Sequence, residues 1–198
     1  MRVTLDGTPA AFGWSGCATL GELTLRARQT CGEGGRALVR LCADGVEVDA
    51  ADPRALARPL AGISELALET LPLARLVAET LEELETHFPL LRETLETAAV
   101  QLREGKEVQA LESVRQATTL WQVSIDVSQE AAKALGGGDP GLADRLERLR
   151  AAMAPLDEAL KRRDFVLVAD LCAYELPPLV DQWAEAVAAL RRDAAARP

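Results

Sequence analysis

The stretch from Lys106 to Leu135 constrains the fold more than any other part of the chain. Small or apolar side chains recur along it at alternating steps of three and four residues: Leu111, Val114, Thr118, Trp121, Ile125, Ser128, Ala132 and Leu135. That period is typical of the face of an α-helix that lies along other helices. Thirty residues of helix make a rod of about 45 Å. Because such a rod cannot leave its stripe in water, we expect the flanking segments to pack against it.

Three further segments carry the same helical period, at residues 77–102, 142–160 and 165–190. The first keeps its phase through Phe88-Pro89, which predicts either one kinked helix or two nearly collinear ones. With the rod at 106–135, these segments predict an antiparallel four-helix bundle over residues 73–192. Residues 193–198 are expected to fray.

The expected helices are separated by recognisable breaks. Gly105 interrupts the period, and the Gly136–Gly141 run predicts a flexible connection. Asp164 is the expected N-cap of the last helix. Within that helix, Pro177-Pro178 must either kink it or start a new one, because neither proline has a backbone N–H to donate.

Residues 1–71 show a different pattern, of short strands and tight turns. The expected order is a strand at Val3–Leu5, a strand at Ala10–Trp14, a helix from Thr19 to about Thr30, strands at Ala37–Cys42 and Val46–Val48, a helical turn from Asp52 to Leu56, and a strand at Leu66–Thr70. The Asp-Gly pairs at 6–7 and 44–45 are hairpin turns, and Thr19 with Glu22 fits a capping box. Strict alternation places Leu38 and Arg40 on one face of their strand, with Val39 and Leu41 on the other.

This order of elements resembles the β-grasp or ubiquitin-like fold. The sulfur-carrier and conjugating members of that superfamily end in a free Gly-Gly tail, whereas here Thr70-Leu71-Pro72 runs into a helix. The plant-type ferredoxins of the same fold need a C-x4-C-x2-C run, which is absent. The remaining implication is a module that presents a strand edge or a sheet face to a protein partner. The expected fold class is therefore α+β, a β-grasp module at 1–71 followed by the bundle at 73–192.

The charge of the chain excludes one large class of partners. The formal net charge is −9, and the isoelectric point is about 4.8. Residues 73–198 hold 15 basic and 22 acidic side chains, a net of −7. Such a field repels nucleic acid and anionic lipid, so we expect neither a nucleic-acid nor a membrane partner. Since there is no basic and apolar leader after Met1, and no long apolar run, we expect a cytoplasmic protein.

Few residues offer chemistry. The single histidine, His87, cannot supply the two Glu-x-x-His motifs of a di-iron bundle and is expected at a helix bend or on the surface. Cys17, Cys31, Cys42 and Cys172 contain no CxxC pair and are expected to be reduced thiols. The glycine runs at 32–35 and 136–138 lack the GK[ST] ending of a phosphate loop. We therefore expect no metal, no cofactor and no catalytic residue.

One cluster in the last helix departs from ordinary helix composition. It contains the only tyrosine of the chain and two consecutive prolines: Asp170, Tyr174, Glu175, Pro177, Pro178, Asp181 and Trp183. The prolines free backbone carbonyls one turn earlier, which predicts either a structural bend or one wall of a groove. On the second reading, these are the expected partner-binding residues. Trp183, like Trp121, also suits a core position.

The sequence therefore predicts non-catalytic protein binding, by an adaptor or a small chaperone-like protein. The partner is expected to be an amphipathic helix held in the bundle groove, or an extended strand added to the β-grasp sheet. The helical part is also similar to the small acidic helical export chaperones of bacterial flagellar systems. Two alternatives remain open: a self-associating structural protein, whose partner is a second copy of itself, and an enzyme of unknown type.

Overall fold

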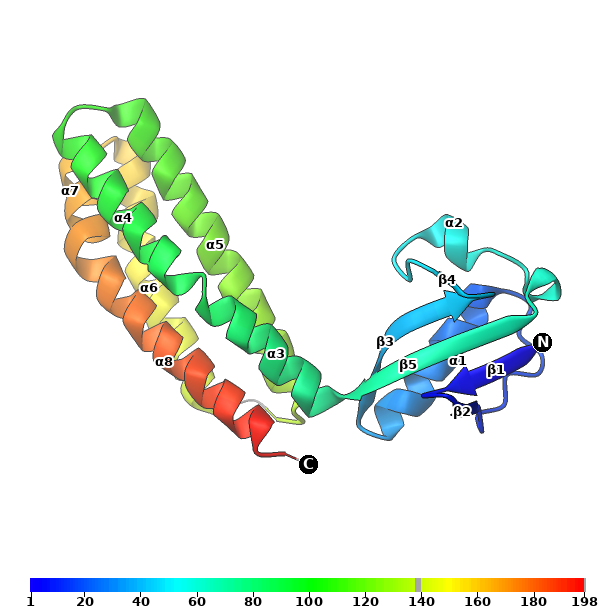
Figure 1. Ribbon diagram of the computed structural model, residues 1–198. Helices are drawn as coiled ribbons and strands as arrows, with labels where there is room; N and C mark the ends of the chain where they lie inside the picture. Colours follow the sequence, from blue (N-terminus) through cyan, green and yellow to red (C-terminus); the bar gives the residue numbers. More distant parts are fainter. Residues whose placement is uncertain (138–139, 198) are drawn as a thin grey trace. The chain divides into compact units, whose positions relative to one another are not determined.

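The computed structural model describes residues 1–137 and 140–197 (Figure 1). The fold is mixed α+β, with a five-stranded sheet in the N-terminal part and helices in the C-terminal part. The chain divides into two compact units, Met1–Leu76 and Val77–Arg197, which are described separately here. The connection predicted over Gly136–Gly141 includes residues 138–139, which lie outside the described residues.

The first unit is a mixed sheet with one long helix. Its strands are β1 (Arg2–Leu5), β2 (Thr8–Pro9), β3 (Arg36–Ala43), β4 (Val46–Glu47) and β5 (Glu65–Pro72). They are ordered β2-β1-β5-β3-β4, and the β1–β5 pair is parallel while the other pairs are antiparallel. The helices are α1 (Leu20–Glu33), α2 (Pro53–Leu56) and a 3-10 turn at Leu60–Gly62. The core lies between α1 and one face of the sheet, where Leu20, Leu23, Leu66 and Leu68 are almost fully buried.

Capping residues fix where the helices of this unit begin. Thr19 Oγ1 accepts the Glu22 backbone N–H at 3.3 Å, and Glu22 Oε2 accepts the Ala18 N–H at 2.7 Å. Two donors that no helical carbonyl can reach are thereby satisfied, which confirms the predicted helix start. Asp52 likewise accepts the Arg54 N–H at 2.9 Å and begins α2. The predicted end of α1 at Thr30 was too early, because the helix continues through Glu33.

Two strand predictions are corrected. Residues 10–14 form no strand. The Ala10 N–H still donates to the Val3 carbonyl at 3.0 Å, but Phe12 and Trp14 pack against the core from an irregular segment. In β3, a β-bulge at Val39 shifts the register against β5. A bulge inserts one residue and reverses the alternation beyond it. Leu38 and Leu41 therefore both face the core, where strict alternation had put them on opposite faces.

The second part is helical. Its elements are α3 (Leu73–Glu85), α4 (Phe88–Arg103), α5 (Glu107–Ala134), α6 (Pro140–Arg162), α7 (Phe165–Asp170), a π-helical turn (Leu171–Glu175) and α8 (Leu176–Ala195). The described residues after Pro72 thus hold six α-helices, not the predicted four. The excess arises because two of the expected rods are divided, one ahead of Pro89 and one ahead of Pro177-Pro178. The last helix also extends to Ala195, with Ala194 buried, where fraying was expected from Asp193.

The helices pack in a definite pattern. In Figure 1, α4 lies between α5 on one side and α7, the π turn and α8 on the other, and α6 packs against α7 and α8. The predicted stripe on α3 and α4 is confirmed, since all of its members are buried: Val77, Leu81, Leu84, Phe88, Leu91, Leu95, Ala98 and Leu102. The phase survives the break because α4 follows α3 almost directly.

The buried face of α5 is turned by one residue from the predicted stripe. Five of the eight members of that stripe are buried as expected: Val114, Trp121, Ser128, Ala132 and Leu135. The other buried row is Ala110, Ala117, Ser124 and Ala131. Small side chains let α4 and α5 pack closely, so they occupy the contact. Of the predicted row, Leu111 is exposed, and Thr118 and Ile125 line a hollow of about 270 Å³ beside α6.

Candidate functional site

The π turn sets the geometry of the predicted cluster. The Leu176 backbone N–H donates to the Leu171 carbonyl, five residues back rather than four. Since Pro177 and Pro178 have no N–H, regular α-helical bonds cannot form at the next two positions either. The extra residue of a π turn accommodates this loss, and within the turn Leu171 and Cys172 stay buried while Tyr174 and Glu175 are exposed. The helix therefore neither simply kinks nor ends there; it passes from α7 to α8 through a widened turn.

Three of the predicted residues line one groove. The Tyr174 groove lies between α6 and the α7–π segment and encloses about 360 Å³. Its lining is Ala152, Pro155, Leu167, Asp170, Leu171, Tyr174 and Glu175. The floor is apolar, and the two carboxylates stand on the rim.

Tyr174 is the most prominent side chain of this groove. It is 64% exposed, which is unusual for an aromatic residue in a helical unit. The Arg103 guanidinium lies over its ring, 5.5 Å from the centroid, and also lies 3.6 Å from Asp170 Oδ1. This cation–π contact and ion pair hold the ring near the end of α4 and limit its freedom.

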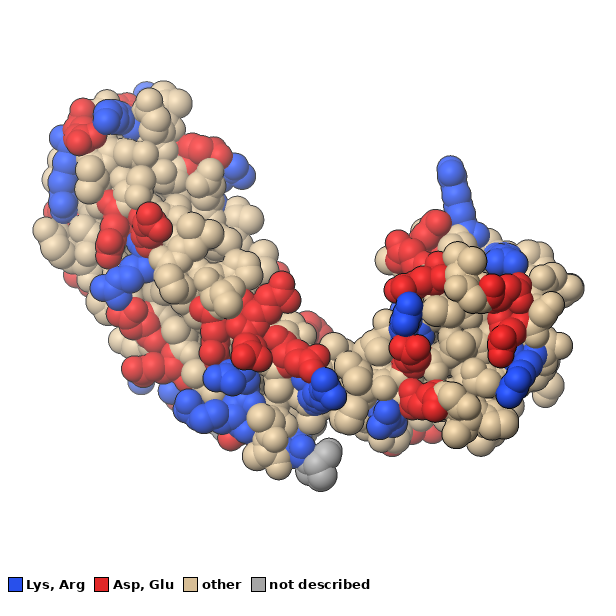
Figure 2. All heavy atoms as spheres, in the orientation of Figure 1, with Lys and Arg blue, Asp and Glu red and all other residues tan. Residues whose placement is uncertain are grey.

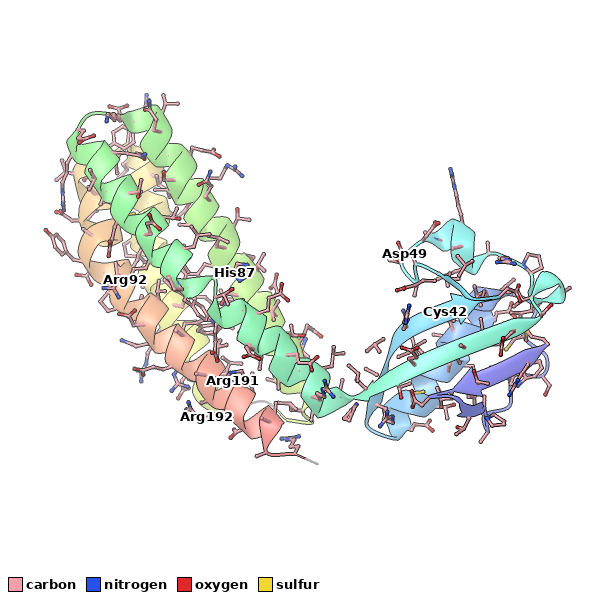
Figure 3. The ribbon with its side chains drawn as sticks, in the orientation of Figure 1. Cys42, Asp49, His87, Arg92, Arg191 and Arg192 are labelled. Atoms are coloured by element: carbon pink, nitrogen blue, oxygen red, sulfur yellow. The ribbon has the colours of Figure 1, made fainter. Side chains whose placement is uncertain are left out.

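Asp181 lies in a different groove. The Asp181 groove runs between the α3–α4 junction and α8 and encloses about 520 Å³. Its lining is Glu85, Phe88, Pro89, Arg92, Val180, Asp181, Ala184, Glu185 and Ala188. Arg92 Nη1 donates to both Asp181 oxygens, and Arg191 Nε donates to Glu85 Oε1 at 2.7 Å. The labelled Arg92 and Arg191 can be located in Figure 3.

The remaining members of the predicted cluster are structural or peripheral. Trp183 is 2% exposed, and Pro177 is also buried, so both belong to the core. Pro178 is exposed but lines neither groove. Trp121 is likewise buried, and neither indole Nε1 finds a hydrogen-bond partner among the described residues.

Sequence reasoning missed the residues on the opposite walls. Arg103, Ala152 and Pro155 come from α4 and α6 and meet Tyr174 only through packing. Arg92 and Glu85 reach α8 in the same way. A sequence signal existed only for Pro155, a proline inside the helical period of residues 142–160. The others are ordinary charged or small helix residues, so no pattern distinguishes them.

The described side chains that could bind a metal ion or act in catalysis do not form a single cluster. In the described part of the chain, no three histidine, cysteine, aspartate or glutamate side chains are placed to hold a metal ion. His87 lies at the bend between α3 and α4 as predicted, with Nδ1 3.1 Å from the Glu83 carbonyl oxygen. All four cysteines are free thiols, of which Cys31 and Cys172 are buried. Burial raises the pKa of Cys172 to about 11, which suppresses its nucleophilic thiolate form.

Comparisons with other proteins bear on the helical part alone. None of the helices in the described ranges combines the length and the apolar character needed to cross a bilayer. No curated protein and no solved structure matches the chain. A family model described as "Domain of unknown function (DUF8042)" matches residues 79–186, which is more than half of the chain and lies within the second unit. The chain belongs to this DUF8042 family.

Proposed function

We propose that this protein is a non-catalytic protein-binding adaptor or small chaperone-like protein. The observation that carries the proposal is Tyr174, a largely exposed aromatic ring on a π turn, above an apolar groove. Exposed and preorganised aromatic side chains are enriched where proteins bind one another, because they contribute much contact area at little entropic cost. The partner places an apolar side chain against Leu167 and Leu171, with a basic neighbour near Glu175.

The same proposal includes the finer description of the fold. A β-grasp module at residues 1–71 is supported by the β2-β1-β5-β3-β4 order, the parallel β1–β5 pair and the packing of α1 on one face of the sheet. For residues 73–192, an antiparallel bundle of four rods is supported if α3 with α4, and α7 with α8, each count as one divided rod. Export-chaperone-like binding is part of this proposal, as is a cytoplasmic location.

Electrostatics supports a protein partner over nucleic acid. The chain carries a net charge of −9, and acidic side chains gather over α3 and its junction with α4 on the face drawn in Figure 2. Such a surface disfavours phosphates and favours basic polypeptides.

The test is photo-crosslinking in the native cell. A benzophenone amino acid replaces Tyr174, and a matched control replaces Val123 of α5, which is 51% exposed and lines neither groove. We expect one defined protein to be crosslinked from position 174 and not from position 123. Identical products from both positions, or none from 174, would contradict the proposal. If particle size also grew with concentration, the self-associating alternative would replace it.

A further inference from the structure

The Asp181 groove owes its space to a helix break and to small side chains. Because α3 ends at Glu85 and α4 begins at Phe88, the wall opposite α8 is interrupted. On α8, Ala184 and Ala188 present only methyl groups to the gap. The floor is formed by Phe88 and Val180, which are buried. The α8 wall from 181 to 188 is about 10 Å long, which matches two turns of an added helix.

Two ion pairs cross this groove. Glu85 of α3 binds Arg191 of α8 at 2.7 Å, and Arg92 of α4 binds Asp181 of α8 at 2.6 Å. They connect the same two walls at separate points along α8. The width of the gap is therefore fixed before a partner enters, which lowers the cost of binding.

Acidic side chains exceed basic ones around the groove. The negative charge of Glu82 also attracts Arg191, and Glu96 forms a second ion pair with Arg92 at 3.2 Å. Both arginine charges are therefore already balanced by carboxylates. Glu185 stands on the groove wall and forms no ion pair within the described residues. An incoming segment thus meets an apolar floor, an unneutralised carboxylate and an acidic surround. Charge complementarity requires it to be basic.

We propose that the Asp181 groove seats a basic amphipathic helix of a partner protein. Small apolar side chains of that helix pack on Ala184 and Ala188, and a lysine or arginine pairs with Glu185. A helix fits better than an extended strand, because the groove walls are helices whose backbone groups are bonded internally. A second copy of this chain is disfavoured by its own net charge of −9. This proposal uses a different groove from Tyr174 and stands independently of the proposed function.

The test uses a displayed library of helical peptides with randomised surface positions, selected on the full chain. Selection is repeated on Ala184→Trp, which fills the groove. We expect the enriched peptides to be basic, with apolar residues at steps of three and four, and to be lost on A184W. For the best peptide, Glu185→Lys should weaken binding at least about tenfold, and exchanging the peptide's facing lysine for glutamate should restore it.

Matched variants separate this proposal from the proposed function. Tyr174→Ala should leave the affinity of the selected peptide unchanged within about twofold, since Tyr174 does not line this groove. Glu185 is exposed, so E185K retains the fold even if A184W does not, and circular dichroism checks both. Peptides that depend on Tyr174 but not on Glu185 would overturn this inference and leave the proposed function standing. Neutral or acidic peptides, or an empty selection, would also overturn it.

Discussion

Arg92 on α4 donates to both carboxylate oxygens of Asp181 on α8, at 2.7 and 2.6 Å, although the residues are 89 positions apart in the chain. The contact joins two helices that also pack against each other, and each contributes buried side chains to the core, Leu91 from α4 and Val180 from α8. Its side chains are 46% and 56% exposed, so water and salt screen the pair. The ion pair positions one end of the Asp181 groove more than it stabilises the fold.

The first prediction follows from that exposure. Asp181→Asn should lower the thermal unfolding midpoint by less than about 3 °C, because exposed ion pairs contribute little to stability. Glu85→Gln should lower it more, since Glu85 and Arg191 are only 27% and 34% exposed. Differential scanning calorimetry at low and high salt measures both. Equal effects of the two variants would contradict the ranking.

The second prediction concerns the face of α5 that meets α4. Ala117 is 1% exposed at this contact, so Ala117→Leu must push the two helices apart and should cost about 1–3 kcal/mol. Thr118→Leu is the matched control, because Thr118 belongs to the stripe predicted from sequence but is exposed in the structure. It should change the free energy of unfolding by no more than about 0.5 kcal/mol. Urea titration measures both; a larger cost for T118L would restore the predicted stripe.

Residue periodicity predicted the long helix α5, but it did not predict which row of its side chains is buried against α4. Leu111, Thr118 and Ile125 suited a buried row by size, whereas the structure buries Ala110, Ala117 and Ser124. The choice depends on how closely α4 approaches, which is a tertiary property. The bulge at Val39 could not be predicted for the same reason, because it is a shift in the pairing of β3 with β5, which is distant in the sequence. The caps at Thr19, Asp52 and Asp164 were predictable because each acts within three residues.

In the candidate site too, the features that depend on local sequence were predictable and those that depend on tertiary packing were not. Asp170, Tyr174 and Glu175 were chosen together from sequence, and the structure places all three on one groove. Asp181 was chosen with them but lies on another groove, because the π turn and the packing of α4 decide which wall it joins. The opposite walls come from residues about 20 to 90 positions away, which no local pattern connects to the cluster.

The third prediction concerns a network at one end of the sheet. Asp6 accepts hydrogen bonds from the Thr70 backbone N–H and hydroxyl, each at 2.7 Å, and from Arg36 at 3.3 Å. Asp6→Ala leaves the part-buried Thr70 amide without this acceptor and should cost about 1–3 kcal/mol. Asp6→Asn keeps an acceptor oxygen and should cost less. Chemical denaturation monitored by amide NMR of β5 distinguishes the two; equal costs would contradict the role of the amide bond.

The fourth prediction is loss of stability in acid. Burial opposes ionisation of Asp6, but the hydrogen bonds from Thr70 and the charge of Arg36 outweigh it and lower the Asp6 pKa. Backbone hydrogen bonds from Glu65 and Ser64 lower the pKa of Asp44. A lowered pKa in the folded state contributes stability above the ordinary value of about 3.9, and that contribution is lost as pH falls through the lowered pKa.

We therefore expect the free energy of unfolding to fall from about pH 5 downward, with part of the slope due to these two groups. Asp6→Asn and Asp44→Asn should each flatten the dependence, because an amide does not titrate in this range. Glu33→Gln is the control, since the exposed Glu33 carboxylate forms no hydrogen bond or ion pair with the described residues. A slope unchanged in D6N and D44N would contradict the assignment.

The last prediction is the order in which the thiols react. Burial raises the Cys172 pKa to about 11, and burial together with the nearby Asp6 charge raises that of Cys31. Cys17 and Cys42 are only half-buried. Alkylation requires an accessible thiolate, so iodoacetamide at pH 8 should modify Cys17 and Cys42 first. Peptide mass spectrometry over time resolves each site, and the same reaction in urea should modify all four cysteines at comparable rates. The Cys172 thiol is fully enclosed in the core between α4 and α8. Early labelling of Cys172 in the native protein would therefore mean that this core opens far more often than its packing implies.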